Sequence, residues 1–419
     1  MWGDRLLAGL ALALFVSLGL AWISLIYLEQ PVERILSFNP DDLGALTGRN
    51  DAARVLGLHA FGDFQLPRLW GQEVLAGSYP DPVPPYLPMS FAYGSFFSSL
   101  TPGWAVGVHQ VLTIVLISGS AWLAMTGVRR SIKIVIVTLT SLITLPMLAV
   151  LDTGNIQGIV IGCLFLGIVL LQRERPGLAS VALALAISFK GYPIVILVWP
   201  LALGYWAFAL RTAGIAISAN LFLFAVIPGG LVSNIDRYIS ALFSRPDQGM
   251  IDAESSLASA VIKVNQALGS PFSMQGSGPT LAELSIGLGW LLLVLLLIRS
   301  RRLPQWLDAF LALSLLQMSI PTTYNYALGW ASIAAIWFGQ GRLLGSSHSD
   351  ANSSPSDSGL AALRWVTIAA LVATLTPFGF RTFVNDAVVN VSTIASPALV
   401  FTVGVLATIH SLRRKAATV

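Results

Sequence analysis

The chain has 419 residues, of which 55% are hydrophobic and only 11% are charged, and its formal net charge is +4. Soluble globular domains carry about 25% charged residues, so this composition excludes an ordinary soluble protein and indicates a polytopic membrane protein. The single cysteine, Cys163, lies within an apolar run. An intrachain disulfide and a cysteine-based zinc site are therefore both excluded.

Apolar segments long enough to cross a bilayer occur along most of the chain. The first, residues 6–28, follows Arg5 and lacks a small-residue cleavage site, so we expect a retained anchor and not a removed signal peptide. The other predicted spans are residues 104–125, 132–151, 156–171, 178–189, 193–210, 215–231, 281–298, 307–320, 327–338, 360–378 and 394–409. The sequence therefore predicts an all-α, polytopic membrane protein with about 12 transmembrane helices, built as a single domain over residues 1–419.

Polar segments separate some of these spans. Residues 29–100 form a large first loop, and its last part, residues 87–100, is apolar but too short to cross the bilayer. We expect a half-buried or re-entrant helix there. Residues 232–280 form a second polar loop, and the Ser/Asp/Asn-rich residues 345–359 are predicted to be a flexible loop.

The basic residues are distributed unevenly between the two faces that this span pattern defines. Fifteen of the 24 Lys and Arg residues lie on the side of the amino terminus, eight lie opposite, and Lys190 falls within the apolar region. Cytoplasmic loops are the richer in Lys and Arg, so both termini and the 345–359 loop are predicted to be cytoplasmic. The first and second loops are then extracytoplasmic, away from ATP and sugar nucleotides.

Several common catalytic motifs do not occur in the chain. It has no Walker loop, no glycine-rich dinucleotide fingerprint, no HExxH and no GxSxG, so nucleotide-driven pumping, zinc proteolysis and triad hydrolysis lack their signatures. It also has no DxD pair that could hold a metal against a nucleotide-sugar diphosphate. An extracytoplasmic transferase must therefore use an activated donor already in the membrane, and a polyprenyl monophosphate sugar is the simplest such donor.

A set of short segments in chain order resembles glycosyltransferase family 87. The segments are GDFQ at 62–65, LAGSYPDP at 75–82, PPYLP at 84–88, TGNIQG at 153–158 and ALAISFKGYP at 184–193, with weaker matches ESSLASAV at 254–261 and PTTYNY at 321–326. This family lies within the C superfamily of glycosyltransferases and includes polyprenyl-phosphate-mannose-dependent mannosyltransferases. The resemblance implies a C-type glycosyltransferase fold with a large first extracytoplasmic loop, and transfer of mannose from a polyprenyl phosphate.

The resemblance also implies a mechanism with Asp63 as the general base. Such a transfer needs a base for the proton of the acceptor hydroxyl and cations near the departing phosphate. Asp63 precedes residues 67–76, whose apolar face suits a helix lying in the membrane interface at headgroup depth. A single carboxylate that does not itself attack the sugar predicts inversion, from a β-linked donor to an α product. The mechanism requires no metal and no cofactor. The alternative for Asp63 is a helix N-cap.

Lys190 is the main candidate for binding the donor phosphate. Gly191 and Pro193 interrupt the apolar pattern next to it, and a helix broken at membrane depth usually lines a cavity. A charged lysine within a span is costly, so it is a functional candidate by default. The alternative is a lysine near the outer surface that snorkels to the interface.

The other candidates for binding the donor sugar or phosphate have ordinary alternatives. Asp152 and Asn155 bracket a tight outer turn, where such residues are common without any function. Arg68 could meet the phosphate, or only solvent and lipid headgroups. Tyr324 and Asn325 stand at an outer span end, where tyrosines belong to the aromatic belt of any membrane protein.

The expected partners are a polyprenyl-phosphate sugar donor, a glycolipid or glycan acceptor and the lipid bilayer, with no nucleic acid. The expected location is the cell membrane, in a cell envelope, as a multi-pass protein with an extracytoplasmic active site. Two alternative functions remain open from sequence. One is a transferase, polymerase or ligase that uses another polyprenyl-phosphate sugar, such as an arabinofuranosyl or hexosyl phosphate. The other is a secondary transporter or lipid flippase, which interrupted helices would also suit.

Overall fold

The computed structural model describes residues 62–81, 86–144, 146–147, 150–151, 154–243, 256–267, 281–319, 328–340, 358–375, 382–384, 387–389 and 394–416. The predicted first span, the first loop before residue 62 and the 345–359 loop up to residue 357 lie outside these ranges. The helices and strands run in the order α5 (Gly62–Leu75), α6 (Pro88–Ser98), α7 (Pro102–Ala124), α8 (Arg130–Thr138), the π-helical turn η1 (Leu139–Ile143), α10 (Gln157–Gln172), α11 (Pro176–Lys190), the 3₁₀ helix η2 (Tyr192–Leu197), α12 (Val198–Ala202), α13 (Trp206–Val226), α14 (Leu231–Phe243), α15 (Leu257–Ala267), α16 (Leu281–Arg299), α17 (Gln305–Met318), α18 (Trp330–Gln340), α19 (Ser358–Leu375), β1 (Thr382–Val384), β2 (Ala387–Val389) and α20 (Ser396–Ala416).

The described chain is helical apart from one small hairpin. Strands β1 and β2 pair antiparallel, with Thr382 opposite Val389. In the described ranges, three helices are long and apolar enough to cross a membrane, namely Pro102–Ala124, Trp206–Val226 and Ser396–Arg414. Shorter apolar helices accompany them, including α10, α11 and α19. The all-α fold expected from the sequence is thus observed.

The helices differ from the predicted spans between residues 193 and 231. Instead of two spans separated near residues 211–214, the chain forms η2 and the short α12, turns at Gly204 and then runs through α13 without a break. Gly204 has a φ of +90°, a backbone conformation that glycine adopts easily, whereas Gly214 has open space around it and fits inside the helix. The prediction ended one span at residue 210 and began the next at residue 215, and this boundary was wrong because α13 runs through it.

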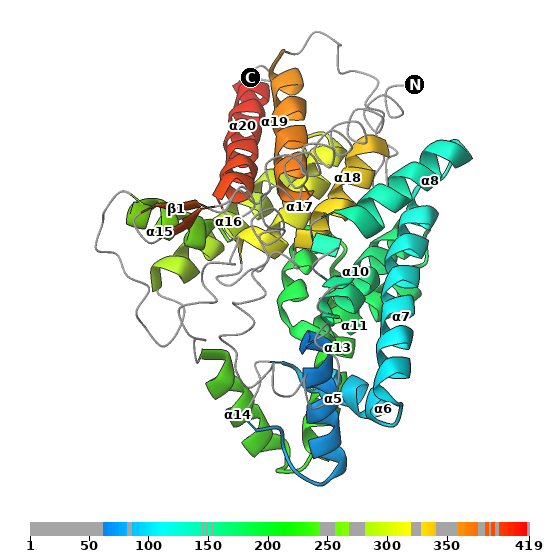
Figure 1. Ribbon diagram of the computed structural model, residues 1–419. Helices are drawn as coiled ribbons and strands as arrows, with labels where there is room; N and C mark the ends of the chain where they lie inside the picture. The colour runs from blue at the N-terminus through cyan, green and yellow to red at the C-terminus, as the bar shows by residue number, and fades with distance from the viewer. Residues whose placement is uncertain are drawn as a thin grey trace.

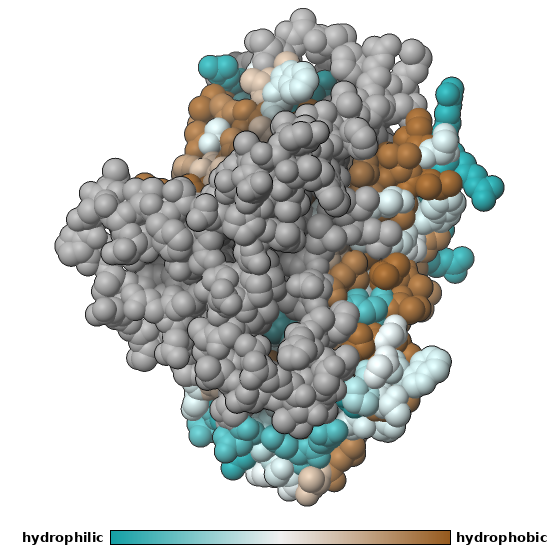
Figure 2. Space-filling view, viewed as in Figure 1, coloured by the Kyte–Doolittle hydropathy of each residue, from teal (hydrophilic) through white to brown (hydrophobic). Residues whose placement is uncertain are grey.

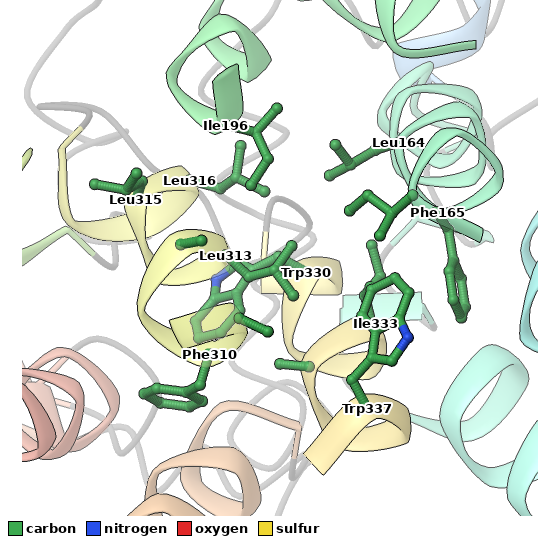
Figure 3. Packing of buried hydrophobic residues seen from close by; sticks show 14 of the residues in the cluster. Leu164, Phe165, Ile196, Phe310, Leu313, Leu315, Leu316, Trp330, Ile333 and Trp337 are labelled. Carbon is green, nitrogen blue, oxygen red and sulfur yellow. The ribbon is translucent and has the colours of Figure 1, made fainter. Parts of the chain in front are cut away.

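The buried core lies among α10, α17 and α18. Figure 3 shows Phe310 and Trp330 facing each other, with Trp337 near Phe165 of α10. The ring centroids are 5.7 Å apart in the first pair and 5.6 Å apart in the second, both edge to face. Such aromatic pairs add to the free energy of burial through complementary ring charges. These helices therefore form a rigid centre against which the outer helices pack.

The outer surface of α7 is apolar. Trp104, Val111 and Val115 are each more than half exposed on this helix. Figure 2 shows brown hydrophobic surface along the flank where Figure 1 places α7, with hydrophilic surface at the tip of α8 and at the opposite end, near α5 and α14. Large apolar side chains exposed along one helix in this way are typical of contact with lipid or another apolar partner.

Helices α5, α6 and α14 lie together at the end of the molecule opposite the carboxyl terminus (Figure 1). Helix α6 occupies the segment 87–100, for which we expected a short half-buried helix. It crosses α5 very closely at two glycines. A Cβ atom added at Gly71 would collide with the backbone of Gly94 and Ser95, and one added at Gly94 would collide with the backbone of Pro67. This crossing fixes α5, and with it Asp63, against the rest of the fold.

Candidate functional site

The structure brings Asp63, Asn155 and Lys190 together in one hydrogen-bonded chain. The Nδ2 atom of Asn155 donates to the Oδ2 atom of Asp63 at 2.8 Å. The Oδ1 atom of the same side chain accepts a hydrogen bond from the Nζ atom of Lys190 at 3.2 Å. Asn155 is 1% exposed, while Asp63 and Lys190 are half-buried. A carboxylate and an ammonium group are thus joined through a buried amide.

Three segment ends hold these side chains. Asp63 lies in the first turn of α5, Asn155 lies just before α10, and Lys190 is the last residue of α11. The chain turns sharply next to two of them, because Gly154 has a φ of +64° and Gly191 a φ of +68°. The three side chains are thus attached at helix ends, where the chain changes direction and the ends of separate helices can meet.

The amide of Asn155 has a defined orientation. Besides the bond from Lys190, its Oδ1 atom accepts the backbone N–H of Gln157 at 2.8 Å. The oxygen therefore faces two donors and the NH₂ group faces the carboxylate, which leaves no reason for the amide to flip. An oriented, buried donor therefore fixes the position of the Asp63 carboxylate.

Two tyrosines lie near the Lys190 end of this hydrogen-bonded group. The Nζ atom of Lys190 lies 4.9 Å from the ring centroid of Tyr86, a cation–π contact. The Nε2 atom of Gln157 donates to the hydroxyl of Tyr192. Sequence reasoning missed Tyr86, Gln157 and Tyr192, although all three lie in segments that carried the family resemblance. The signal was weak, because tyrosine and glutamine near span ends are ordinary packing residues.

Phe64, the residue after Asp63, packs in an aromatic cluster. The ring of Phe64 stacks on His109 of α7, with centroids 4.5 Å apart, and meets Phe97 of α6 edge to face at 5.4 Å. The hydroxyl of Tyr93 shares a hydrogen bond of 2.7 Å with the Nδ1 atom of His109. Phe64, Phe97 and His109 are each 1% exposed. The residue next to Asp63 is therefore held by packing from two other helices.

Helix α14, in the second predicted loop, contacts the same region. The Arg237 guanidinium lies 5.3 Å from the ring centroid of Tyr79, and a Cβ atom added at Gly191 would lie 3.7 Å from the hydroxyl oxygen of Tyr238. Burial raises the pKa of Tyr79 to about 12, although the positive charge of Arg237 acts in the opposite direction. The two polar loops predicted to be extracytoplasmic thus meet at the site.

Arg68 serves the fold at this end of the molecule. Its guanidinium donates to the carbonyls of Phe97 at 3.2 Å and Leu100 at 3.0 Å, and to the Oε1 atom of Gln65 at 2.8 Å. Arg68 is 3% exposed, and burial lowers the pKa of its side chain. These bonds fasten α5 to the end of α6. That Arg68 also binds the donor phosphate stays a prediction.

The remaining sequence candidates are not placed by the structure. Asp152, Tyr324 and Asn325 lie outside the described residues. Within the described ranges, no three side chains of His, Cys, Asp or Glu gather as a metal-binding group.

Comparison with curated proteins and with solved structures gave no match. The model of glycosyltransferase family 87 matches residues 85–323, more than half of the 419 residues. The matched range includes Tyr86, Asn155, Gln157, Lys190 and Tyr192, and it begins after Asp63. A match of this extent agrees with the short segments that suggested the same family from the sequence. The chain is therefore a membrane-associated glycosyltransferase, and it belongs to glycosyltransferase family 87.

Proposed function

We propose that the protein transfers a sugar, most simply mannose, from a polyprenyl monophosphate to a glycolipid or glycan acceptor on the extracytoplasmic face of a cell membrane. The observation that carries this proposal is the Asp63–Asn155–Lys190 chain, which joins a carboxylate to a cation within hydrogen-bonding distance of one amide. A base for the acceptor and a cation for the leaving phosphate are the two groups that the reaction requires.

The proposed topology has about 12 spans with both termini in the cytoplasm, in a C-type glycosyltransferase fold. It is supported by the excess of Lys and Arg on one side of the spans. The site lies where α5 and α11 pack against α6, beside the two loops assigned to the extracytoplasmic face. Only a donor held in the membrane can be presented to that face.

In the proposed reaction, the Asp63 carboxylate accepts the proton of the acceptor hydroxyl as the acceptor oxygen forms a bond to the anomeric carbon. The bond between that carbon and the phosphate oxygen breaks at the same time, and the electron pair leaves with the polyprenyl phosphate. Lys190 stabilises the phosphate charge, which grows as the bond breaks. Attack from the face opposite the phosphate inverts the anomeric centre, so a β-linked donor gives an α-linked product.

Asn155 orients the two charged groups in this scheme. Its NH₂ group donates to the carboxylate and its oxygen accepts from the ammonium group, so one side chain contacts both of the groups that the reaction requires. We retain Asp152, Tyr324 and Asn325 as proposed ligands of the donor on the basis of the family resemblance alone.

The test is a transfer assay with the purified protein in lipid nanodiscs and a panel of labelled donors. The panel contains polyprenyl phosphate mannose, polyprenyl phosphate arabinofuranose and GDP-mannose, with extracted membrane lipids as acceptors. We expect transfer from polyprenyl phosphate mannose, with an α linkage shown by release with α-mannosidase. Transfer from GDP-mannose would contradict the proposal. Movement of the lipid-linked sugar across proteoliposomes without a new glycosidic bond would support a flippase in its place.

A further inference from the structure

We propose that the phenol of Tyr192 donates a hydrogen bond to the phosphate of the polyprenyl-phosphate donor, and that Gln157 is the positioning residue that aims it. This inference rests on the proposed function and deepens it, because it assigns a further group to the phosphate end of the same site.

The turn at Gly191 places Tyr192 beside Lys190. Lys190 ends α11, Tyr192 begins η2, and Gly191 between them has a φ of +68°. Both side chains then reach the start of α10, where Lys190 binds Asn155 and Tyr192 binds Gln157. The backbone N–H of Gln157 also donates to the amide oxygen that Lys190 contacts. The ammonium and the phenol are therefore anchored to neighbouring points of one cluster.

The direction of the hydrogen bond leaves the phenolic proton available. The Nε2 atom of Gln157 donates to the hydroxyl oxygen of Tyr192, so this oxygen acts as the acceptor. A phenol can accept and donate at once. Within the described part of the chain, no acceptor for the Tyr192 proton is observed. A phosphate oxygen can only accept, so it complements this donor.

The oxygen of the Gln157 amide is also able to accept a hydrogen bond from a ligand. Its Oε1 atom is buried and has no hydrogen-bond partner among the described residues, although Gln157 is only 1% exposed. Buried polar atoms are nearly always paired, and an unpaired one signals a ligand or water that completes the site. The pair therefore offers both a donor and an acceptor, which matches a sugar phosphate with its phosphate oxygens and its hydroxyl groups.

The charge around the pair favours the phosphate as the partner of the phenol. Lys190 supplies a positive charge two residues away, and its Nζ atom is held over the ring of Tyr86 at 4.9 Å from the centroid. As the glycosidic bond breaks, negative charge accumulates on the phosphate, and a donor aimed at it strengthens in the transition state. Tyr192 would thus act with Lys190 on the leaving group, while Asp63 acts on the acceptor.

The test measures binding of polyprenyl phosphate, which lacks a sugar, and of the matching uncharged polyprenol to the protein in nanodiscs. Tyr192→Phe removes only the hydroxyl, and we expect its affinity for polyprenyl phosphate to fall about 10-fold, as for a hydrogen bond to a charged group. Its affinity for polyprenol should stay unchanged. Tyr205→Phe is the control, because Tyr205 is 49% exposed and lies just before α13. It should bind both lipids as the wild type does.

A second variant separates positioning from folding. Gln157→Met keeps the side-chain volume but removes the donor that holds the phenol, so we expect a smaller loss of polyprenyl phosphate affinity. In the double variant the loss should equal that of Tyr192→Phe alone, because Gln157 acts through Tyr192. If Tyr192→Phe does not fold, the loss in Gln157→Met carries the test.

Unchanged polyprenyl phosphate affinity in Tyr192→Phe, with or without a lower unfolding temperature, would overturn the inference and leave Tyr192 as a packing residue. A wild-type protein that does not bind polyprenyl phosphate would overturn the proposed function and this inference together.

Discussion

At the scale of single residues, the site depends on one buried amide. Asn155 contacts Asp63 on one side and Lys190 on the other, and these partners are 92 and 35 positions away in the sequence. Its side chain therefore sets the distance between the proposed base and the proposed phosphate ligand. This arrangement predicts that Asn155 matters for catalysis as well as for folding.

We predict that Asn155→Leu lowers the turnover number about 10- to 100-fold. The variant keeps the volume but removes the donor to the Asp63 carboxylate and the acceptor for Lys190, so both groups lose their fixed position. The measurement is steady-state transfer per folded protein. The control is Asn220→Leu, which removes a buried amide whose Nδ2 atom donates only to the backbone oxygen of Ala216 in α13. Equal loss of turnover in both variants would contradict the catalytic assignment of Asn155.

The sequence singled out Asp63, Asn155 and Lys190, each beside an ordinary alternative. Their contact could not be predicted, because spacing along the chain does not determine which ends of three separate helices meet. The local contacts of Arg68 could not be predicted either. Its position in the first loop suggested a phosphate ligand, and in the structure its guanidinium donates to the carbonyls of Phe97 and Leu100 at the end of α6.

At the scale of elements, the position of Asp63 depends on how closely α5 and α6 cross. Gly71 and Gly94 allow the two backbones into contact, and each lacks the Cβ atom that would separate them. Small residues at helix crossings serve the same purpose in membrane proteins generally. The crossing is thus a structural requirement for the site, although neither glycine touches it.

We predict that Gly94→Ala destabilises the protein by about 1–3 kcal/mol, as overpacking usually does, and lowers transfer because α5 must shift. Thermal unfolding in detergent and the transfer assay measure the two effects. Gly107→Ala in α7 is the matched control, because an added Cβ there meets nothing within 4 Å. Gly107→Ala should leave both quantities nearly unchanged. A Gly94→Ala protein with wild-type stability would show that the two helices are not in close contact.

The boundaries of the elements were predicted less well than their existence. The apolar run after residue 193 shows no periodicity that separates one long helix from two shorter ones, and the break fell at Gly204 instead of Gly214. Both are glycines in an apolar context. What distinguishes them is the backbone conformation, since Gly204 alone of the two has a positive φ, and the sequence pattern does not reveal this.

At the scale of the whole molecule, composition alone predicted a helical membrane protein. The uneven distribution of Lys and Arg then predicted which side of the membrane each loop occupies. The proposed function requires this orientation. In the structure, α5, α6 and α14 gather at one end, and the carboxyl-terminal end of α20 lies at the other (Figure 1). The direction relative to the membrane is open to a direct test.

We predict that a cysteine at position 78 reacts with a membrane-impermeant maleimide in intact cells, whereas one at position 131 reacts only after the cells are opened. Ser78 follows α5 and Ser131 lies in α8, and both are exposed. Each substitution, Ser78→Cys or Ser131→Cys, is made in a Cys163→Ala background, since Cys163 is the only native cysteine. Labelling of position 131 in intact cells would contradict cytoplasmic termini and an extracytoplasmic site.

The most direct test of the whole account is the activity of Asp63→Asn with polyprenyl phosphate mannose, measured beside its affinity for the same donor. The variant keeps the shape of the side chain but cannot accept the acceptor proton, so we predict that transfer falls at least about 100-fold while donor affinity stays within about twofold. Asp236→Asn, at an exposed carboxylate of α14, should transfer at the wild-type rate. Wild-type transfer by Asp63→Asn would show that Asp63 has only a structural role at the start of α5, and the proposed mechanism would fail.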